Sequence, residues 1–323
     1  MIKVNITENE GNQRLDRFLK KYFENAPLSM IYKLIRKDIK INGKRSKNDA
    51  MIHVGDEISI YISDEDFENF TRKKPRAKVK RQFTIAYEDE NILVVEKPFG
   101  LLTHGDNIEK KNHLANQVYD YLIEKGEFNP RIEKTFSPAS VNRLDRNTTG
   151  LVLFGKNSYS LQTLNQMIRD KDKISKYYLT IVKGHLKDKM CLKDKIIKDT
   201  EKNLVSVLPN TEEMGKVIET IVSPISYTRG YTLVEVEIIT GRSHQIRAHL
   251  AKIGHPIIGD IKYGDKRTNN IMRQKFGLTT QLLHAHKLIF NECPGALHYL
   301  EGKEIVATLP KDFERIKNSI FEQ

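Results

Sequence analysis

The sequence has little of what marks secreted or membrane proteins. Its 323 residues include two cysteines, Cys191 and Cys293, which lie far apart and suggest no disulfide framework. No apolar run approaches the roughly 20 residues of a membrane-spanning helix. The first residues, MIKVNITENEGNQ, lack the apolar core of a signal peptide. We therefore expect a cytoplasmic, reduced protein without a membrane partner.

Motifs for metals and nucleotide cofactors are also missing. The chain has no C-x-x-C, no H-E-x-x-H, no deaminase signature and no glycine-rich turn of a dinucleotide fold. Six histidines that might suggest a metal (His104, His113, His244, His249, His284 and His286) therefore lack ligand spacing. We expect no metal and no cofactor.

Positive charge, by contrast, is in large excess. The formal net charge is +12, and 30% of the residues are charged. Such an excess favours a polyanionic partner, either nucleic acid or an anionic membrane surface. Because the basic residues are spread along the chain, we favour nucleic acid. The length allows one large core plus an accessory module.

The first 62 residues predict two short helices and a small sheet. The helix that begins at Arg14 has one apolar face, and Ser29 is expected to cap a second helix after Pro27. The patterns R-L-D-x-F-L, I-x-I-N-G and V-G-D-x-I-x-I follow in order. This arrangement resembles the small RNA-binding domain named after ribosomal protein S-four. Residues 63–82, acidic and then strongly basic, are predicted to be an extended, charged linker.

The most informative stretch is VNRLDRNTTGLVLFGK, residues 141–156. One carboxylate, Asp145, lies between Arg143 and Arg146, before a small-residue turn and an apolar run that predicts a buried strand. Nearby guanidinium groups favour the ionised form of such a carboxylate. An isolated Asp between two arginines is more often a surface ion pair, so the interpretation depends on the other motifs.

Three further segments carry candidate chemistry. K-P-F-G-L follows a predicted strand at 91–96, and K-Y-Y-L-T lies within a predicted strand that includes Tyr178. TGRSHQIRAHL ends a strand and begins a helix, for which Ser243 is the expected N-cap, with Arg247 near its first turn. A tyrosine in a strand, taken alone, packs in a core more often than it functions.

The ordered combination decides the matter. K-P-x-G-L, N-R-L-D-x-x-T-T-G-L, K-x-Y-x-T, T-G-R-S-H-Q-I-R, H-P-I-x-G-D and L-H-A-x-x-L-x-F resemble the RluA-type pseudouridine synthase family over residues 83–292. With the N-terminal module, the chain is similar to the RluC/RluD-like branch. The resemblance implies an α+β protein, in which the small domain precedes a catalytic domain at 83–323 with a mixed, largely antiparallel sheet. One departure is Asn142, where the family commonly has His.

The resemblance also implies the site. Asp145 would be the catalytic carboxylate. Tyr178 would be the cleft tyrosine that stacks on the base, with a role as general base left open. Arg247 would be the partner of Asp145, with Arg242 as the alternative. The implied substrate-binding residues are Arg143, which would fill the stack vacated by a flipped base, Arg242 and Leu283. Isomerisation of uridine breaks a glycosidic bond without redox change, and a carboxylate suits that chemistry.

Several functions remain open from the sequence. The preferred one is isomerisation of specific uridines to pseudouridine in large-subunit ribosomal RNA, by a monomer. A tRNA pseudouridine synthase of the same family is the first alternative. A non-catalytic RNA-binding or ribosome-assembly factor is a second, and the intact Asp145, Tyr178 and Arg247 argue against it. A metal-dependent RNA hydrolase lacks ligands at usable spacing.

Overall fold

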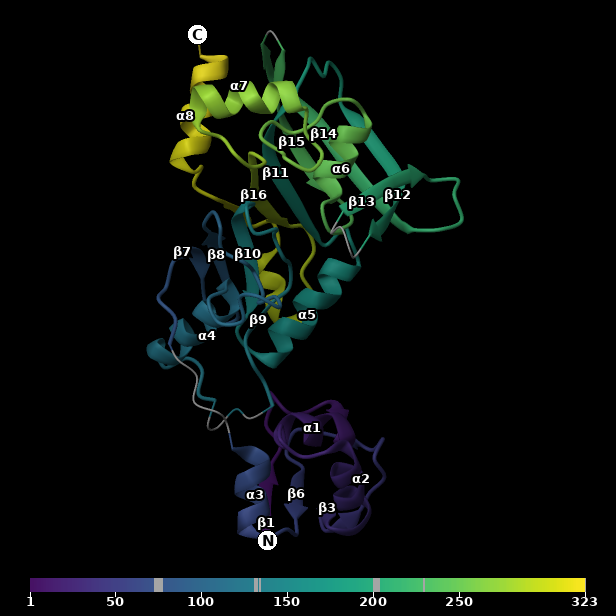
Figure 1. The fold of residues 1–323 in the computed structure, drawn as a ribbon. Coiled ribbons are helices and arrows are strands. Elements are labelled where there is room, and N and C mark those ends of the chain that lie inside the picture. Colours follow the sequence, from purple (N-terminus) through teal and green to yellow (C-terminus); the bar gives the residue numbers. More distant parts are fainter. Residues whose placement is uncertain (73–77, 131–132, 134, 200–203, 229, 323) are drawn as a thin grey trace. The chain divides into compact units, whose positions relative to one another are not determined.

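The computed structural model describes residues 1–72, 78–130, 133, 135–199, 204–228 and 230–322 (Figure 1). The chain divides into two compact units. The first contains residues 1–80, 117–139 and 155–162. The second contains residues 81–116, 140–154 and 163–323.

The N-terminal module of the first unit has the predicted two helices and small sheet. Its helices are α1 (Leu15–Tyr22) and α2 (Leu28–Lys37). Its strands are β1 (Ile2–Asn5), β2 (Gln13–Arg14), β3 (Ile39–Ile41), β4 (Lys44–Arg45), β5 (Met51–Ile52) and β6 (Glu57–Ile60). Strands pair in the order β1-β6-β3-β4, and β2 pairs with β5. The predicted cap at Ser29 is wrong, because α2 starts at Leu28, so Ser29 lies inside the helix and Pro27 occupies the N-cap position.

The acidic half of the predicted linker is a helix, α3 (Asp64–Thr71). Ser63 caps it by accepting a hydrogen bond from the Asp66 N–H at 3.1 Å, and acidic residues in a first turn complement the helix dipole. Phe67 and Phe70, three positions apart, pack against the N-terminal core. The expectation of an extended segment is therefore wrong for this half. Residues 73–77 of the basic half lie outside the described residues.

The first unit also includes segments that were predicted to belong to the catalytic domain. The Asn9 amide donates to Glu133 Oε2 at 2.8 Å, and Asn9 Oδ1 accepts from the Ser158 N–H at 3.0 Å. Thr135 Oγ1 donates to Glu10 Oε1 at 3.3 Å. The early residues of the chain are therefore tied to residues far beyond the predicted boundary at residue 62.

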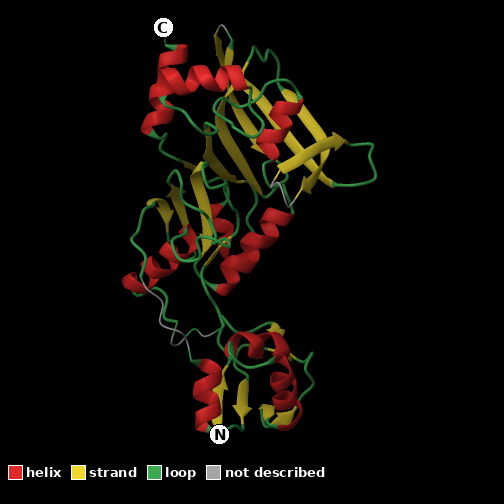
Figure 2. Ribbon diagram, in the orientation of Figure 1, coloured by secondary structure: helices red, strands yellow, loops and turns green. Residues whose placement is uncertain are grey.

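A large sheet organises the second unit, and Figure 2 shows its strands in yellow. They follow the order β13-β12-β14-β15-β11-β16-β10-β8-β7, with β17 on β16 and β9 on β10. The bounds are β7 (Thr84–Glu88), β8 (Ile92–Lys97), β9 (Ala139–Ser140), β10 (Thr149–Gly155), β11 (Ile174–Lys183), β12 (Met190–Asp199), β13 (Leu204–Pro209), β14 (Lys216–Thr228), β15 (Tyr231–Ile238), β16 (Leu283–Phe290) and β17 (Glu304–Val306). The β10–β16 pair is parallel, whereas neighbours such as β11–β15 and β14–β15 are antiparallel. The expectation of an α+β protein with a mixed, largely antiparallel sheet is confirmed.

The remaining helices are α4 (Leu114–Lys125), α5 (Ser158–Arg169), α6 (Gln245–Lys252), α7 (Lys266–Phe276) and α8 (Lys311–Phe321), with a 3-10 turn at Gly295–Leu300. Most of α4 belongs to the first unit, whereas α6, α7, α8 and the second half of α5 belong to the second unit. Leu164 and Met167 of α5 pack with apolar side chains of β8 and β10. Met272 of α7 and Phe313 of α8 pack with Leu179 of β11. None of the helices in the described ranges is long and apolar enough to cross a bilayer.

Candidate active site

The loop that holds Asp145 (residues 141–148) ends where β10 begins. The Thr148 N–H donates to the Asp145 carbonyl at 3.1 Å, so residues 145–148 form a tight turn. Gly150 follows with φ of +108°, and a Cβ there would lie 2.1 Å from the carbonyl oxygen of Ala285 on β16. Only glycine fits this approach, which explains the T-G that follows the turn. The expected turn and strand are both present.

A buried lysine ties this loop to the preceding strand. Lys97 is 1% exposed and donates from Nζ to three carbonyl oxygens, those of Pro98 (3.1 Å), Leu101 (2.7 Å) and Arg146 (2.9 Å). Burial lowers the pKa of Lys97 to about 7, and the Asp145 carboxylate opposes this shift. The three carbonyls satisfy all three donors of the ammonium group. Lys97 thus fixes the backbone directly after Asp145.

Asn142 fastens the other side of the loop to β10. Its Oδ1 accepts from the Leu153 N–H at 2.9 Å, and its Nδ2 donates to the Leu151 carbonyl at 3.3 Å. Thr103 Oγ1 donates to the Leu144 carbonyl at 3.0 Å and accepts from the Leu144 N–H at 3.1 Å. The amide that stands where the family commonly has His therefore forms a two-bond clamp on the strand backbone.

Asp145 forms an ion pair with Arg247 of α6. Asp145 Oδ2 lies 3.2 Å from Arg247 Nη1, across 102 residues of sequence. The adjacent Arg146 pairs with Asp106 instead, at 3.5 Å. The Arg143 side chain is exposed. The expected cradle of two neighbouring arginines is therefore replaced by a guanidinium from a distant helix.

A second carboxylate, Asp260, holds the rest of the Arg247 guanidinium. Asp260 is fully buried and accepts from Arg247 Nε at 2.6 Å and from Nη2 at 2.9 Å, a two-bond ion pair. Asp260 Oδ1 also accepts from the N–H groups of Lys262 (2.9 Å) and Tyr263 (3.1 Å). Burial acts to raise the pKa of Asp260, but these hydrogen bonds and the guanidinium lower it overall. The buried Asp260 carboxylate thus orients the Arg247 guanidinium, which contacts the partly exposed Asp145 carboxylate.

His244 approaches Asp145 from the start of α6. It is the N-cap of the helix, with φ of 54°, so the predicted N-cap at Ser243 is wrong. No described side chain forms a cap hydrogen bond at this helix end; the Gln245 side chain instead holds the preceding loop, because its Oε1 accepts from the Arg242 N–H at 3.1 Å. The left-handed backbone of His244 turns the chain sharply into the helix.

The hydrogen bonds around Tyr263 assign the tautomer of His244. Tyr263 Oη accepts from the Val205 N–H at 2.8 Å and lies 2.9 Å from His244 Nδ1. We infer that the Tyr263 hydroxyl donates its hydrogen bond to His244 Nδ1. The neutral imidazole then carries its proton on Nε2, which lies 3.8 Å from Asp145 Oδ2. Burial lowers the pKa of His244, although Asp145 opposes the shift, and a lowered pKa favours this neutral form. The Tyr263 ring also lies 5.2 Å from the Arg247 guanidinium carbon.

Tyr178 and Leu283 share one face of the sheet. Tyr178 of β11 pairs with Ala285 of β16, and Thr180 pairs with Leu283, so their side chains point the same way. Tyr178 is 7% exposed. Burial, and after it the Asp145 carboxylate, raises the pKa of Tyr178. The phenol is therefore protonated at neutral pH, which favours stacking over proton abstraction in the free protein.

Tyr178 lines a cavity of about 470 Å³ that we call the basic cleft. Five cationic side chains line the same cavity: Arg143, Arg169, Lys171, Lys176 and Arg242. None of the described residues that line it is acidic. The basic cleft thus combines an aromatic side chain with a concentration of positive charge, which suits a base and its flanking phosphates.

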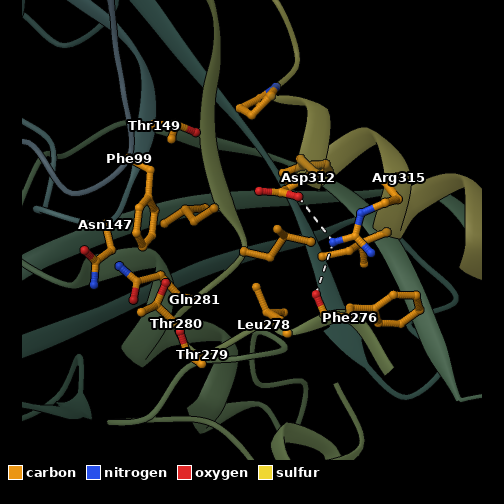
Figure 3. Close-up of a pocket in the computed structure, with 16 residues that line it drawn as sticks. Phe99, Asn147, Thr149, Phe276, Leu278, Thr279, Thr280, Gln281, Asp312 and Arg315 are labelled. Atoms are coloured by element: carbon orange, nitrogen blue, oxygen red, sulfur yellow. Dashed lines mark hydrogen bonds and ion pairs between the residues drawn. The ribbon is translucent and has the colours of Figure 1, made fainter. Parts of the chain in front are cut away.

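A second cavity, of about 240 Å³, is lined by Asn147, Thr149 and Leu283 together with residues 276–282 and parts of residues 310–316 (Figure 3). Leu283 lies in the wall of this cavity, whereas Tyr178 lines the basic cleft. The structure therefore brings Asp145 and Arg247 into contact and gathers Arg143, Arg242 and Tyr178 around one cleft. Leu283 belongs to the neighbouring cavity.

Comparison with known proteins identifies the family. Residues 91–252 match the family described as RNA pseudouridylate synthase. This chain belongs to that family. It is therefore an RNA pseudouridine synthase, an enzyme whose substrate is RNA.

Relatives of this synthase cover nearly its whole length. The ribosomal large subunit pseudouridine synthase C of Buchnera aphidicola is 32% identical over 319 residues, which cover 96% of this chain and 94% of the relative. The protein of that name from Escherichia coli is 32% identical over 301 residues, covering 90% and 89%. An RNA pseudouridine synthase of Mycoplasma capricolum is 34% identical over 311 residues, covering 95% and 97%.

A solved structure shows the same fold. The human RNA pseudouridylate synthase domain containing 4 matches with a TM-score of 0.55 and 24% identity, over 71% of this chain and 90% of that chain. The large sheet of this synthase is therefore the sheet of a pseudouridylate synthase fold.

Four residues of the synthase that contact the Asp145 loop, or the side chains that hold Asp145, received no role from the sequence: Lys97, His244, Asp260 and Tyr263. Lys97 and Asp260 lie in the K-P-x-G-L and H-P-I-x-G-D motifs, so their motifs were visible while their contacts were not. His244 was counted only among possible metal ligands. No group of three or more His, Cys, Asp or Glu side chains suited to a metal ion occurs among the described residues.

Proposed function

We propose that this synthase isomerises specific uridines of large-subunit ribosomal RNA to pseudouridine, with Asp145 as its catalytic carboxylate. The observation that carries the assignment of Asp145 is the ion-pair chain from Asp260 through Arg247 to Asp145. A carboxylate oriented in this way, close to a basic cleft, can act on the glycosidic carbon or on the uracil ring. The ribosomal target is supported by the names of the near full-length relatives.

Asp145 is both paired with a guanidinium and available to a substrate. Arg247 directs one N–H at it, because Asp260 occupies the guanidinium's Nε and Nη2. The Asp145 side chain is 31% exposed, so a substrate atom can reach its free oxygen. His244 supplies a second, longer-range donor in its neutral form. Together these groups fix the carboxylate without burying it.

The target uridine reaches this carboxylate by leaving its helical stack. Flipping a base costs a few kcal/mol, which protein contacts must offset. We assign Tyr178 to stacking on the extruded base, and Arg143 to the space that the base leaves. Arg242 and the other cations of the basic cleft then contact flanking phosphates. Leu283, on the sheet face of Tyr178, packs against the uracil ring.

The N-terminal module, residues 1–62 in the sequence-based boundary, is assigned to binding structured RNA. Basic side chains are distributed along α1 and α2, including Arg17, Lys21, Lys33 and Arg36. All four of these residues are exposed. Exposed lysine and arginine on short helices bind phosphates without reading sequence.

The test is to map pseudouridine in ribosomal RNA and tRNA from cells with and without the gene. We expect the loss of one or more sites in large-subunit ribosomal RNA, restored by the wild-type gene and not by Asp145→Asn. Loss of tRNA sites alone would replace the proposed target with the tRNA alternative. An unchanged map in both RNAs would contradict the proposed function.

A further inference from the structure

Apart from Leu283, no described residue that lines the smaller of the two cavities has a role in the reaction assigned above. We call it the neutral cavity, and its floor is apolar, with Leu278, Phe276 and Phe313 among its lining residues. The two charged side chains in its lining form an ion pair, so their charges compensate. Arg315 Nη2 donates to Asp312 Oδ1 at 3.2 Å and to the Phe276 carbonyl at 3.1 Å. A cavity with a compensated ion pair and apolar walls suits an uncharged ligand, not a phosphate.

An amide at the cavity wall points to what that ligand is. Gln281 lines the cavity and is 6% exposed, and its side chain forms no hydrogen bond with any residue that the structure describes. Its amide atoms are not among the buried, unpartnered polar atoms of the described residues, so they reach the solvent in the cavity, and a ligand with matching donors and acceptors can replace that water. Figure 3 shows Gln281 next to Asn147 and Phe99 on one side of the cavity, with the Asp312–Arg315 pair on the other.

The cavity opens beside the catalytic loop. Asn147, which lines the cavity, belongs to the same four-residue turn, Asp145–Thr148, as the catalytic carboxylate. Phe99, also in its lining, is 60% exposed, so its ring is accessible to a ligand. An exposed aromatic ring and free amide groups are the side chains with which proteins hold single-stranded bases.

We propose that the neutral cavity binds the base of a nucleotide next to the target uridine, stacked on Phe99 and hydrogen-bonded by the Gln281 amide. The target base itself belongs elsewhere, because neither Asp145 nor Tyr178 is among the described residues that line this cavity. The volume of about 240 Å³ accommodates a flat base, since cavities of roughly 150 Å³ hold a benzene ring. The charged phosphates of the RNA then bind in the basic cleft, and the uncharged neighbouring base binds in the neutral cavity.

The experiment pairs a change in the protein with a change in the RNA, and it rests on the proposed function. Short RNAs contain a uridine mapped as above, with an abasic nucleotide replacing the neighbour on either side. We expect the wild-type kcat/KM to fall about 5- to 100-fold for the abasic replacement on one side. In Gln281→Leu and in Phe99→Ala, the same replacement has a much smaller effect, because the contact is already lost.

Gln274→Leu is the matched control, since Gln274 is exposed on α7 and does not line the cavity. In this control variant, the abasic replacement should lower kcat/KM by the same factor as in the wild type. Equal abasic factors in the wild type, Gln281→Leu and Phe99→Ala would overturn the proposal, while isomerisation of the intact RNA would leave the proposed function standing. No isomerisation of any RNA by the wild type would overturn the proposed function itself.

Discussion

The two carboxylates that hold Arg247 are expected to respond differently to the same substitution. Asp145→Asn and Asp260→Asn each replace one charged partner of the guanidinium by an amide of the same shape. Asp145 is 31% exposed and makes one hydrogen bond to Arg247, whereas Asp260 is fully buried and makes two. Asp145→Asn therefore tests whether Asp145 takes part in the reaction, and Asp260→Asn tests whether Asp260 positions Arg247 and Asp145.

For Asp145→Asn we expect almost no change in stability and a nearly complete loss of isomerisation. A partly exposed ion pair contributes about 0–1 kcal/mol to the free energy of unfolding, and Arg247 keeps both bonds to Asp260. An amide can neither attack nor stabilise positive charge, so kcat should fall at least about 1000-fold.

For Asp260→Asn we expect a loss of about 3–5 kcal/mol in unfolding free energy, because a buried guanidinium loses its main counter-charge. Displacing Arg247 also moves Asp145, so kcat should fall up to about 100-fold. The folded pKa of Asp260 lies below its usual 3.8. Its contribution is therefore complete above about pH 5 and is lost as the pH falls through the folded value.

Urea unfolding between pH 3 and 8 and tritium release from C5-labelled RNA measure the two effects. Glu124→Gln is the control, because Glu124 forms an exposed pair with Lys78 at 3.1 Å. It should change stability by no more than about 0.5 kcal/mol. Equal stability losses in Asp145→Asn and Asp260→Asn, or an Asp145→Asn enzyme with a tenth of wild-type activity, would refute the reasoning.

Three further predictions concern the loop and its contacts. Lys97→Met should remove a pH dependence: in the wild type, stability relative to this variant rises from pH 7 to 10.5, by at most about 1.4 kcal/mol per unit, because only the unfolded lysine keeps its proton there. A stability difference independent of pH would contradict the lowered pKa of Lys97. Gly150→Ala should cost at least about 2 kcal/mol in urea unfolding and most of the activity, since its Cβ would meet the Ala285 carbonyl at 2.1 Å, and a variant as stable as the wild type would show that the strands can separate. Tyr263→Phe keeps the ring beside Arg247 but removes the hydroxyl that fixes the tautomer of His244, so kcat should fall several-fold at unchanged KM, and a change in KM alone would argue against that role.

Local patterns predicted several elements of this fold. The apolar run after the Asp145 turn identified β10, and the strand predicted at 91–96 corresponds to β8. Helix α3 was missed because its acidic residues suggested a solvated segment, while the pair Phe67 and Phe70 supplied the apolar contact that orders it. The predicted caps at Ser29 and Ser243 failed because Pro27 and His244 occupy the N-cap positions, and neither of them forms a side-chain cap hydrogen bond.

The candidate site was predictable as motifs but not as contacts. The sequence identified the Asp145 loop and named Arg247 through the family resemblance. Asp260 had no assigned role, because nothing in its own segment shows that it meets a guanidinium 13 residues earlier. The sequence likewise placed Lys97 only at the end of a strand. Its three carbonyl partners come from two separate turns, so its contacts could not be inferred from its own segment. Contacts between distant segments depend on the folded sheet, which local spacing does not describe.

The parallel pairing of β10 with β16 also sets when the enzyme becomes competent during its own synthesis. Thr149 pairs with His284, 135 residues later, and Gly150 pairs with Ala285. At about 5–20 residues per second, a ribosome needs about 7–27 s to make that interval. Until then the strand that follows Asp145 lacks one neighbour, and Tyr178 lacks the strand beside it. A nascent chain can thus fold α1 and α2 long before it can isomerise a uridine.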